Sequence, residues 1–271
     1  MRTAKKTDPA PPHAADQSAA SMNAWRDNIY FVLVEPKEPG NIGASARAIK
    51  NMGFQRLRLV NPPDITDEAR WLACNALDIL NHAETFGSVR EAVRDMSIVV
   101  GTTARKGKSR GLILPVEQGV KRVSAEIAGN KVALLFGRES RGLYNAEVAE
   151  CGLLMTIPSS SAQPSLNLAQ AVMIVAYETS KALWAVHDEG LKKKKGNAGR
   201  LNLVTHEEVT ALYDRMTDLL RMLEYIPRGD RDLEKKIMLN LKHFIGRAGL
   251  TDWELNMLHG VISQVQKKIR P

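Results

Sequence analysis

Three separated segments of the chain each run from an apolar, strand-like stretch into a turn rich in glycine, serine or asparagine. They are PGNIGASARAIKNMG (39–53), ALLFGRESRGL (133–143) and IPSSSAQPSLNLAQAV (157–172), and the first and third continue into a helical pattern. In α/β proteins such junctions lie at the carboxyl ends of parallel strands, where ligands bind. The three segments therefore predict an α/β domain with one composite site along that edge of its sheet.

The remaining pattern also alternates between strand and helix. Strands are predicted at the apolar runs 29–34, 57–60, 98–100, 132–136 and 153–157. Helical spacing is found at 44–52, 67–80, 89–96, 145–149 and 167–187. This alternation favours a parallel, doubly wound sheet with helices on both faces.

The two ends of the chain differ from this domain. Residues 1–26 are rich in proline, alanine and serine, which predicts a disordered leader before a domain at 27–187. At 188–204 glycine, asparagine and lysine displace apolar residues, as expected for a basic linker. Three helical patterns follow (205–223, 230–245 and 251–268), and capping boxes begin the first and third, at Thr205 with Glu208 and at Thr251 with Glu254. Residues 205–271 are therefore expected to form a small all-helical extension.

Charge is concentrated at the carboxyl end. The net charge is +8, and residues 191–271 hold sixteen Lys or Arg against ten Asp or Glu, a difference of +6. A basic appendage favours a polyanionic partner, with nucleic acid ahead of membrane. A solvated linker with a basic tail fits the charge equally well. No apolar stretch reaches the roughly eighteen residues that span a membrane.

The two cysteines, Cys74 and Cys151, are far apart and lack metal-ligand spacing. We expect both to be buried, reduced thiols of a cytosolic protein, with no metal site.

The first turn has the composition of an anion site. Gly40 and Gly43 flank Asn41 at the expected start of a helix, whose free amides favour an anion, and Arg47 follows. A tight turn with a surface arginine is the alternative. As a dinucleotide fingerprint, the spacing of Gly40, Gly43 and Ala46 lacks the close glycine pair, and no acid ends the second strand. A nucleotide-dependent oxidoreductase is therefore disfavoured.

The second and third turns favour a ligand less strongly when each is taken alone. Gly137 would allow a close backbone approach to a ligand, whereas Glu139 is expected to pair with Arg138 or Arg141. Ser165 could cap the last helix of the domain. Capping does not explain the whole polar stretch before it, which suits a cofactor-enclosing loop with Ile157 and Leu166 as apolar walls.

The motifs NIGASARA, FGRESRGL and PSLNLAQAV resemble the three signature motifs of the SPOUT superfamily of RNA methyltransferases. Within it they are similar to the TrmH-like 2′-O-ribose methyltransferases, and most of all to the TrmJ-like tRNA branch. That branch also has a strand followed by T-x-A-R, here residues 102–105, and a helical C-terminal extension. The resemblance covers about residue 28 to the C-terminus.

The resemblance implies a trefoil knot in the C-terminal part of the sheet, an exception to the unknotted rule. It also implies S-adenosylmethionine held by the knot loops, and a homodimer whose active site uses both subunits. The implied cofactor contacts are Thr103, Ala104, Arg105, Gly137, Ile157, Pro164, Ser165 and Leu166. Relatives often have serine at the positions of Thr103 and Pro164, and a proline can contact a ligand only through its carbonyl or ring.

The catalytic candidates implied by the resemblance are Asn41, Arg47, Glu139 and Asn167. Methyl transfer from a sulfonium needs in-line placement of a hydroxyl and removal of its proton, but no metal. Because a guanidinium stays protonated, we expect Arg47 to bind a neighbouring phosphate and stabilise the developing alkoxide rather than act as a base.

The implied substrate is cytoplasmic tRNA, methylated on the ribose of pyrimidine 32 in the anticodon loop. The residues themselves support only a polyanion, through Arg105, Lys106, Lys108, Arg110 and the lysine run 192–195. We expect the C-terminal helices to add RNA affinity. The same chemistry on ribosomal RNA and a non-catalytic RNA-binding protein of the same fold remain as alternatives.

Overall fold

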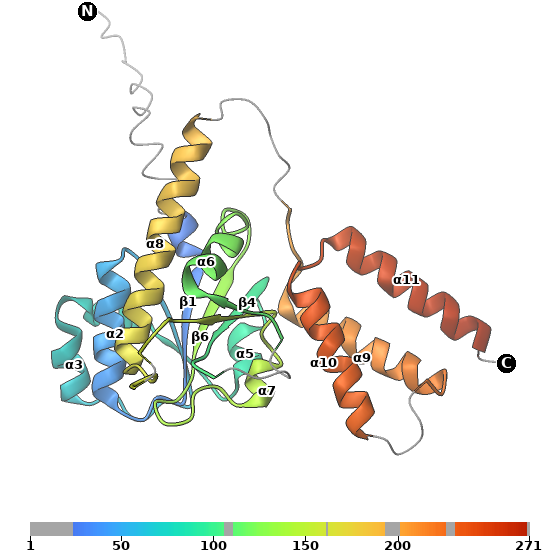
Figure 1. Ribbon diagram of the computed structural model, residues 1–271, viewed down its shortest axis with the longest axis horizontal. Coiled ribbons are helices and arrows are strands. Elements are labelled where there is room, and N and C mark those ends of the chain that lie inside the picture. Colours follow the sequence, from blue (N-terminus) through green and yellow to red (C-terminus); the bar gives the residue numbers. More distant parts are fainter. Residues whose placement is uncertain (1–23, 106–110, 161, 193–200, 226–230, 270–271) are drawn as a thin grey trace, which may run out of the picture.

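The computed structural model describes residues 24–105, 111–160, 162–192, 201–225 and 231–269 (Figure 1). A helical turn at residues 24–27 precedes the first strand. The elements of the α/β domain are β1 (Ile29–Val34), α2 (Pro39–Asn51), β2 (Arg56–Val60), α3 (Asp67–Ala73), a 3₁₀ turn (Cys74–Ala76), α4 (Leu77–Asn81), β3 (Glu84–Phe86), α5 (Val89–Val93), β4 (Ile98–Thr102), β5 (Ile113–Pro115), α6 (Val116–Ser124), β6 (Val132–Phe136), α7 (Asn145–Val148), β7 (Leu153–Thr156) and α8 (Leu168–Lys192). The C-terminal helices are α9 (His206–Met222), α10 (Arg231–Gly246) and α11 (Asp252–Ile269).

The seven strands form one parallel sheet in the order β3-β2-β1-β6-β4-β7-β5. Every residue of β1, an inner strand of the sheet, is buried. Its side chains alternate between two apolar clusters, so that Phe31 faces one and Val32 the other. This confirms the predicted parallel sheet with helices on both faces. The trefoil knot stays a prediction.

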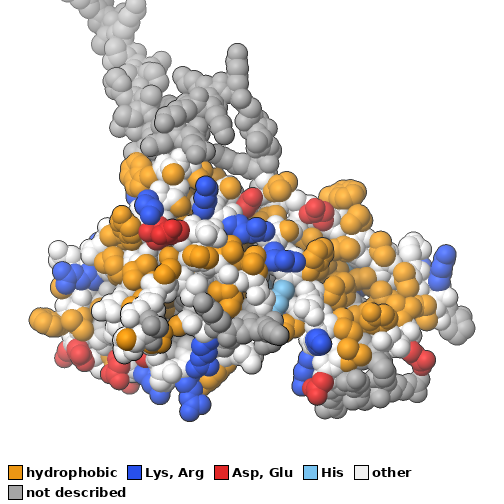
Figure 2. Space-filling model, in the orientation of Figure 1, with side chains coloured by type: hydrophobic (Ala, Val, Ile, Leu, Met, Phe, Trp, Pro, Cys, Tyr) orange, Lys and Arg blue, Asp and Glu red, His pale blue; other side chains and the backbone are white. Residues whose placement is uncertain are grey.

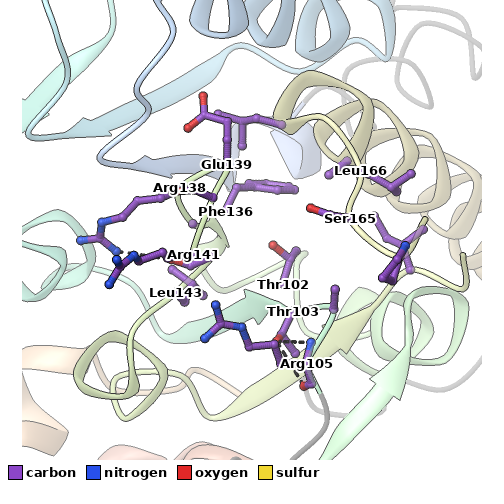
Figure 3. Close-up of a pocket in the computed structure, with 18 residues that line it drawn as sticks. Thr102, Thr103, Arg105, Phe136, Arg138, Glu139, Arg141, Leu143, Ser165 and Leu166 are labelled. Carbon is purple, nitrogen blue, oxygen red and sulfur yellow. Dashed lines mark hydrogen bonds between the residues drawn. The ribbon is translucent and has the colours of Figure 1, made fainter. Parts of the chain in front are cut away.

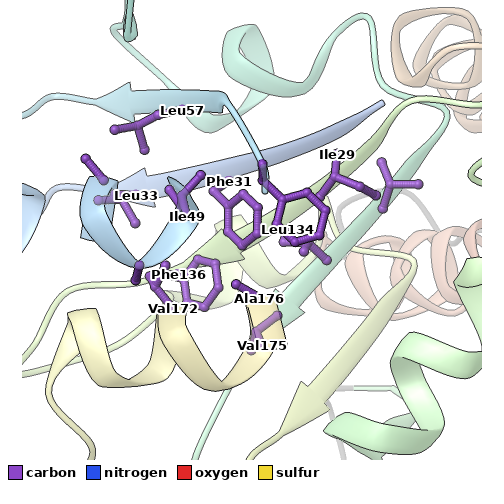
Figure 4. Close-up of a cluster of buried hydrophobic side chains, with 14 of the residues drawn as sticks. Ile29, Phe31, Leu33, Ile49, Leu57, Leu134, Phe136, Val172, Val175 and Ala176 are labelled. Atoms are coloured by element: carbon purple, nitrogen blue, oxygen red, sulfur yellow. The ribbon is translucent and has the colours of Figure 1, made fainter. Parts of the chain in front are cut away.

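Helices α2, α6 and α8 contribute to the larger cluster on one face of the sheet (Figure 4). Phe31 is at its centre and stacks on Phe136 with ring centroids 6.2 Å apart. Helices α5 and α7 contribute Val89, Ala92 and Val148 to the cluster on the other face. Both faces are therefore covered, as the continuous apolar strands require.

Helix α2 begins five residues earlier than predicted, so Gly40 and Gly43 lie within it rather than in a turn. A side chain at Gly43 would collide with the carbonyl of Ala69 on α3. This glycine therefore permits two helices to pack closely, a tertiary requirement that the local pattern does not reveal.

The predicted helix at 67–80 is interrupted at Cys74, whose φ of 49° lies in the left-handed region that few side chains adopt. Cys74 is exposed, so the expectation that both cysteines are buried is wrong for this one. Cys151 is buried, and burial raises the pKa of its thiol.

Three elements were not predicted. Strands β3 and β5 have only three residues each and lie at the two edges of the sheet. Helix α6 carries Gly119, a poor helix former, because the side chain of Met155 fills the space where its Cβ would be.

The C-terminal helices have an apolar core of their own, which includes Leu212, Ile245, Leu255 and Ile262. The capping boxes predicted before α9 and α11 are both present. The proposed domain limits stay predictions. Helix α8 continues to Lys192, beyond the predicted limit at residue 187. Arg26 stacks on Trp184 of α8, so part of the predicted leader is packed against the domain.

Residues 1–23 of the leader and 193–200 of the linker lie outside the described residues. Among the predicted RNA contacts, so do Lys106, Lys108 and Arg110.

The C-terminal helices dock at the amino-terminal ends of the central strands. The amide of His206 donates to the carbonyl of Met96 (2.7 Å), and the Asn130 side chain bonds the backbone at Leu201 and Leu203. Gly246 of α10 contacts Gly152, immediately before β7, so closely that a Cβ on either would overlap the other's backbone. None of the helices in the described ranges combines the length and apolar character needed to cross a membrane.

Candidate active site

A pocket of about 320 Å³ opens at the carboxyl ends of β4, β6 and β7 (Figure 3). Three turns form it: residues 102–105 after β4, residues 136–143 at the end of β6, and the loop between β7 and α8 with the first turn of that helix. Its volume falls in the range of small-molecule sites, about 300–1,000 Å³. The composite site predicted at this edge of the sheet therefore corresponds to a single pocket.

All the predicted cofactor contacts line this pocket, namely Thr103, Ala104, Arg105, Gly137, Ile157, Pro164, Ser165 and Leu166. Their role in binding a cofactor stays a prediction. The lining also includes residues that were not predicted as cofactor contacts or catalytic residues: Thr102, Phe136, Arg138, Ser140, Arg141, Gly142, Leu143, Leu168 and Ala171. Most of these belong to the 133–143 segment, whose position after a buried strand was the available signal.

Two glycines fold the turn after β6 back on itself. A side chain at Gly137 would collide with the backbone of Gly142 and Leu143, and Gly142 has a φ of 57°. The amide of Gly142 donates to the carbonyl of Arg138 (2.7 Å). Glycine at 137 is thus required by the chain's own backbone, and its predicted close approach to a ligand stays a prediction.

Arg138 is buried and holds this turn in place through its side-chain bonds. Its guanidinium bonds the carboxylates of Glu35 and Glu147 and lies 3.9 Å from the centre of the Tyr144 ring. Burial alone would lower the pKa of Arg138, but the bonds to the two carboxylates outweigh burial and raise it. The prediction that Glu139 pairs with Arg138 or Arg141 is therefore wrong, since Arg138 has other partners and Glu139 bonds elsewhere.

Glu139 accepts hydrogen bonds from three neutral donors. The Asn41 side-chain amide donates to Oε1 (2.9 Å), and the amides of Lys37 and Glu38 approach the same carboxylate at 3.1 to 3.4 Å. Burial raises the pKa of Glu139, but these hydrogen bonds outweigh burial, so its pKa lies below the ordinary value. The anion expected beside the first helix is thus the protein's own carboxylate, bound to the two amides that immediately precede α2.

Asn167 extends this network to the third motif. Its Nδ2 donates to Oδ1 of Asn41 (2.9 Å), while its own Oδ1 accepts from the amide of Ala169 (2.9 Å). Asn167, rather than Ser165, therefore caps α8. Asn41, Glu139 and Asn167 come from three separate elements and form one continuous hydrogen-bonded chain, which we call the amide–carboxylate chain.

Arg47 is not part of this chain. It lies six positions after Asn41 on α2, which places the two side chains about 120° apart around a helix of about 3.6 residues per turn. Its guanidinium is exposed and donates to Sγ of Cys74 (3.4 Å). The structure thus brings together three of the four catalytic candidates and leaves Arg47 on another face.

The site combines an ionised carboxylate, two oriented side-chain amides and a partly apolar pocket. Its rim also carries exposed cations, at Arg105 and Arg141. Such a site can bind a small polar–apolar ligand and orient a hydroxyl beside it. Within the described ranges, no group of three His, Cys, Asp or Glu side chains is placed to hold a metal.

Comparison with known proteins matches both parts of the chain. Residues 28–177 match the SpoU rRNA methylase family, and residues 207–271 match the C-terminal domain of the tRNA methyltransferase TrmJ. The tRNA (cytidine/uridine/adenosine-2′-O-)-methyltransferase TrmJ of Pseudomonas aeruginosa is 35% identical over 249 residues, covering 90% of this chain and 96% of that protein. The TrmJ of an Escherichia coli strain is 36% identical over 252 residues, covering 89% and 96%.

A solved structure agrees with these matches. The crystal structure of TrmJ from Z. mobilis ZM4 superposes with a TM-score of 0.72 at 30% identity, covering 88% of this chain and 98% of that one. The three signature motifs lie at or beside one pocket, and the C-terminal helices match the TrmJ C-terminal domain. The chain therefore belongs to the SpoU methylase family of methyltransferases, in its TrmJ-like branch.

Proposed function

We propose that this protein transfers a methyl group from S-adenosylmethionine to a ribose 2′-hydroxyl of cytoplasmic tRNA, at pyrimidine 32 of the anticodon loop. The observation that carries the proposal is the single pocket built from the three motifs, with the amide–carboxylate chain beside it. The names of the relatives, tRNA 2′-O-methyltransferases, support the same reaction and substrate.

The pocket lining fits S-adenosylmethionine, which supplies an electrophilic methyl group when bound. Leu143, Ile157 and Leu166 offer apolar surface for a base. The turns at 102–105 and 136–143 offer backbone polar groups for a ribose and an amino-acid end. The Thr103 hydroxyl accepts from the amide of Arg105 (3.1 Å), which shapes the first of these turns.

The amide–carboxylate chain is suited to orienting a substrate hydroxyl. Glu139 is held ionised and can accept a hydrogen bond from the 2′-hydroxyl, but its lowered pKa makes it a weak base. We therefore assign it an orienting and electrostatic role. The O–CH₃ bond would form as the S–CH₃ bond of the sulfonium breaks to leave a thioether, and the hydroxyl proton would pass to solvent. Asn41 holds the carboxylate by donating to it, and Asn167 in turn orients Asn41 by donating to its Oδ1.

Arg47 requires a second subunit to act in this scheme. Since it points away from the amide–carboxylate chain of its own subunit, we propose a homodimer in which each Arg47 binds a phosphate at the partner's pocket. The exposure of Trp71 (76%), whose carbonyl accepts from the Cys74 thiol, supports an interface on this side.

Mixing two inactive variants tests the shared site. After random exchange of Arg47→Ala and Glu139→Ala subunits, half of the dimers are mixed, and each mixed dimer has one intact site. We expect recovery of about a quarter of the wild-type activity. Mixtures as inactive as the separate variants would contradict the shared site.

The proposed reaction is tested by offering labelled S-adenosylmethionine with total tRNA and, separately, with ribosomal RNA. Digestion of the product then identifies the methylated nucleoside. We expect label in tRNA as 2′-O-methylcytidine or 2′-O-methyluridine. Label in ribosomal RNA alone would overturn the substrate and favour the second candidate, which the description of the SpoU rRNA methylase family motivates.

A further inference from the structure

Arg105 and Gly111, on either side of residues 106–110, lie beside the pocket and beside the C-terminal helices respectively. Arg105 lines the pocket at the carboxyl ends of the strands, whereas Gly111 lies just before β5, where that strand begins. The carbonyl of Leu112 accepts from the amide of Leu154 (3.1 Å). A Cβ at Gly111 would lie 2.8 Å from Nδ1 of His243, so α10 packs directly on this backbone. The side of the domain that carries Arg105 and Gly111 therefore reaches from the pocket to α10.

This side carries exposed cations. Lys121 and Arg122 lie in the last turn of α6, and Nη2 of Arg122 donates to the carbonyl of Arg247, after α10 (3.2 Å). No carboxylate of the described residues forms an ion pair with Arg105, Lys121, Arg122 or Arg247. Figure 2 shows several Lys and Arg side chains in the middle of the molecule, where the α/β domain meets the C-terminal helices.

Elsewhere on the domain, several exposed cations are neutralised. Lys50 pairs with Asp78 at 2.7 Å, and Lys131 pairs with Asp95 at 2.9 Å. Unpaired cations along one side create a local positive potential, which attracts a polyanion.

An exposed aromatic ring lies within this positive region. Phe244 of α10 is 66% exposed, and the guanidinium of Arg247 lies 6.0 Å from its ring centre. Proteins bind unpaired nucleotides by stacking bases on such rings and pairing cations with the phosphates. A membrane surface or an acidic protein would satisfy the charges but would make no comparable use of an isolated ring beside an arginine.

We propose that the substrate RNA extends from the pocket across this side of the molecule, with its phosphates on Arg105, Lys121, Arg122 and Arg247 and an unpaired base on Phe244. We call these five residues the basic track. The proposal rests on the proposed function and deepens it, because it names the route by which one RNA contacts both the pocket and the C-terminal helices.

The test measures binding of an anticodon stem–loop RNA to the full-length chain, without cofactor, at several salt concentrations. The double variant Arg122→Glu/Arg247→Glu is compared with Arg56→Glu/Arg94→Glu, which makes the same charge change at exposed residues of β2 and of the end of α5. We expect the first variant to weaken binding at least tenfold. The slope of the logarithm of the binding constant against the logarithm of the salt concentration should fall by about 1.4, because each of two lost phosphate contacts on a single strand contributes about 0.7. We expect the second to change neither by more than about twofold.

Three further variants separate structural from binding effects. Arg122→Lys/Arg247→Lys retains the charges and is expected to bind RNA within about threefold of the wild type. Phe244→Ala should weaken binding about tenfold with the salt slope unchanged, and Phe244→Tyr should restore it.

Equal losses in the two charge-reversed proteins, or unchanged binding in the first, would overturn the basic track. Because RNA binding is measured without cofactor, this result is independent of methyl transfer. A wild-type chain that binds RNA along the track but transfers no methyl group would overturn the proposed function alone.

Discussion

The two ends of the parallel strands are built in opposite ways. We call the side of the sheet where the strands end the carboxyl edge, and the side where they begin the amino edge. At the carboxyl edge, the turns after β4, β6 and β7 enclose a pocket, and Glu139 is bound by neutral amides beside it. At the amino edge, the C-terminal helices close the sheet through backbone bonds such as that from His206 to Met96, and through the contact of Gly152 with Gly246. One edge therefore leaves room for ligands, whereas the other is filled by the protein itself.

The two carboxylates at these edges show the same contrast. Glu139 has no cationic partner in the described part of the chain, so its charge is available to a ligand or a substrate hydroxyl. Glu150, at the amino edge, bonds His206 (2.7 Å) and pairs with Lys242 (3.5 Å). An acidic residue whose charge is neutralised by its neighbours serves docking, and one held only by amides is suited to chemistry.

The largest expected effect follows from removing the carboxylate at the carboxyl edge. Glu139→Ala should lower kcat/KM for methyl transfer at least 100-fold, because an oriented electrostatic group contributes about 2.7–4 kcal/mol to such steps. Glu150→Ala is the matched change at the amino edge and should cost less than about tenfold. Steady-state kinetics with tRNA measures both, and equal losses would remove the functional distinction between the edges.

The next effect concerns the closed edge. Gly246→Val introduces a side chain where the backbone of Gly152 lies, and should destabilise the protein by about 1–3 kcal/mol. Hydrogen exchange at the amides of His206 and Glu207, which bond Met96 and Arg94, should become faster. Gly260→Val on α11 faces open space and is the control, with a change within about 0.5 kcal/mol. Indistinguishable variants would mean that the glycine contact does not hold α10 in place.

A smaller effect is expected within the C-terminal helices. Thr205→Ala removes the side chain that caps α9, and should lower the free energy of unfolding by about 1 kcal/mol in a denaturant titration. Thr217→Ala, in the same helix, removes only a bond to the carbonyl of Tyr213 and should cost less. The reverse order would show that the capping box contributes little.

The smallest effect is a pH dependence at the amino edge. Bonds from Arg58 and Lys131 outweigh the burial of Asp95 and lower its pKa from 3.8 to about 2. A lowered carboxyl pKa stabilises the fold above the unfolded value, and that contribution is lost as the pH falls from about 4 towards 2. Urea titrations over this interval should show a shallower decline for Asp95→Asn than for the wild type. Parallel curves would assign the acid sensitivity to other carboxylates.

Much of the carboxyl edge could be predicted from the sequence. Gly137, Ser165 and Asn167 differ in type from the apolar strands before them, and a parallel sheet brings the ends of its strands together. The partners within the site could not be predicted in the same way. Arg138 bonds Glu35 and Glu147 rather than Glu139. The pairing of β1 with β6 places Glu35 beside it, and the fold at Gly137 and Gly142 turns the chain back before Glu147.

The amino edge gave almost no local signal. Gly152 and Gly246 are ordinary in their own segments, and only the crossing of α10 over the start of β7 makes them necessary. The same holds for Gly43. The close packing of α2 on α3 requires a glycine at this position, whereas the sequence pattern indicated a ligand-binding turn. Contacts between distant segments are not encoded in the periodicity or turn chemistry of either one.

The most direct test of the account is hydrogen exchange of the full-length chain with and without S-adenosylmethionine. We predict slower exchange of the amides at 103–105, 137–143 and 165–166 when the cofactor is present, and unchanged exchange at Gly152, His206 and Glu207. Protection confined to the amino edge, or no protection at saturating cofactor, would contradict the assignment of the pocket at the carboxyl edge.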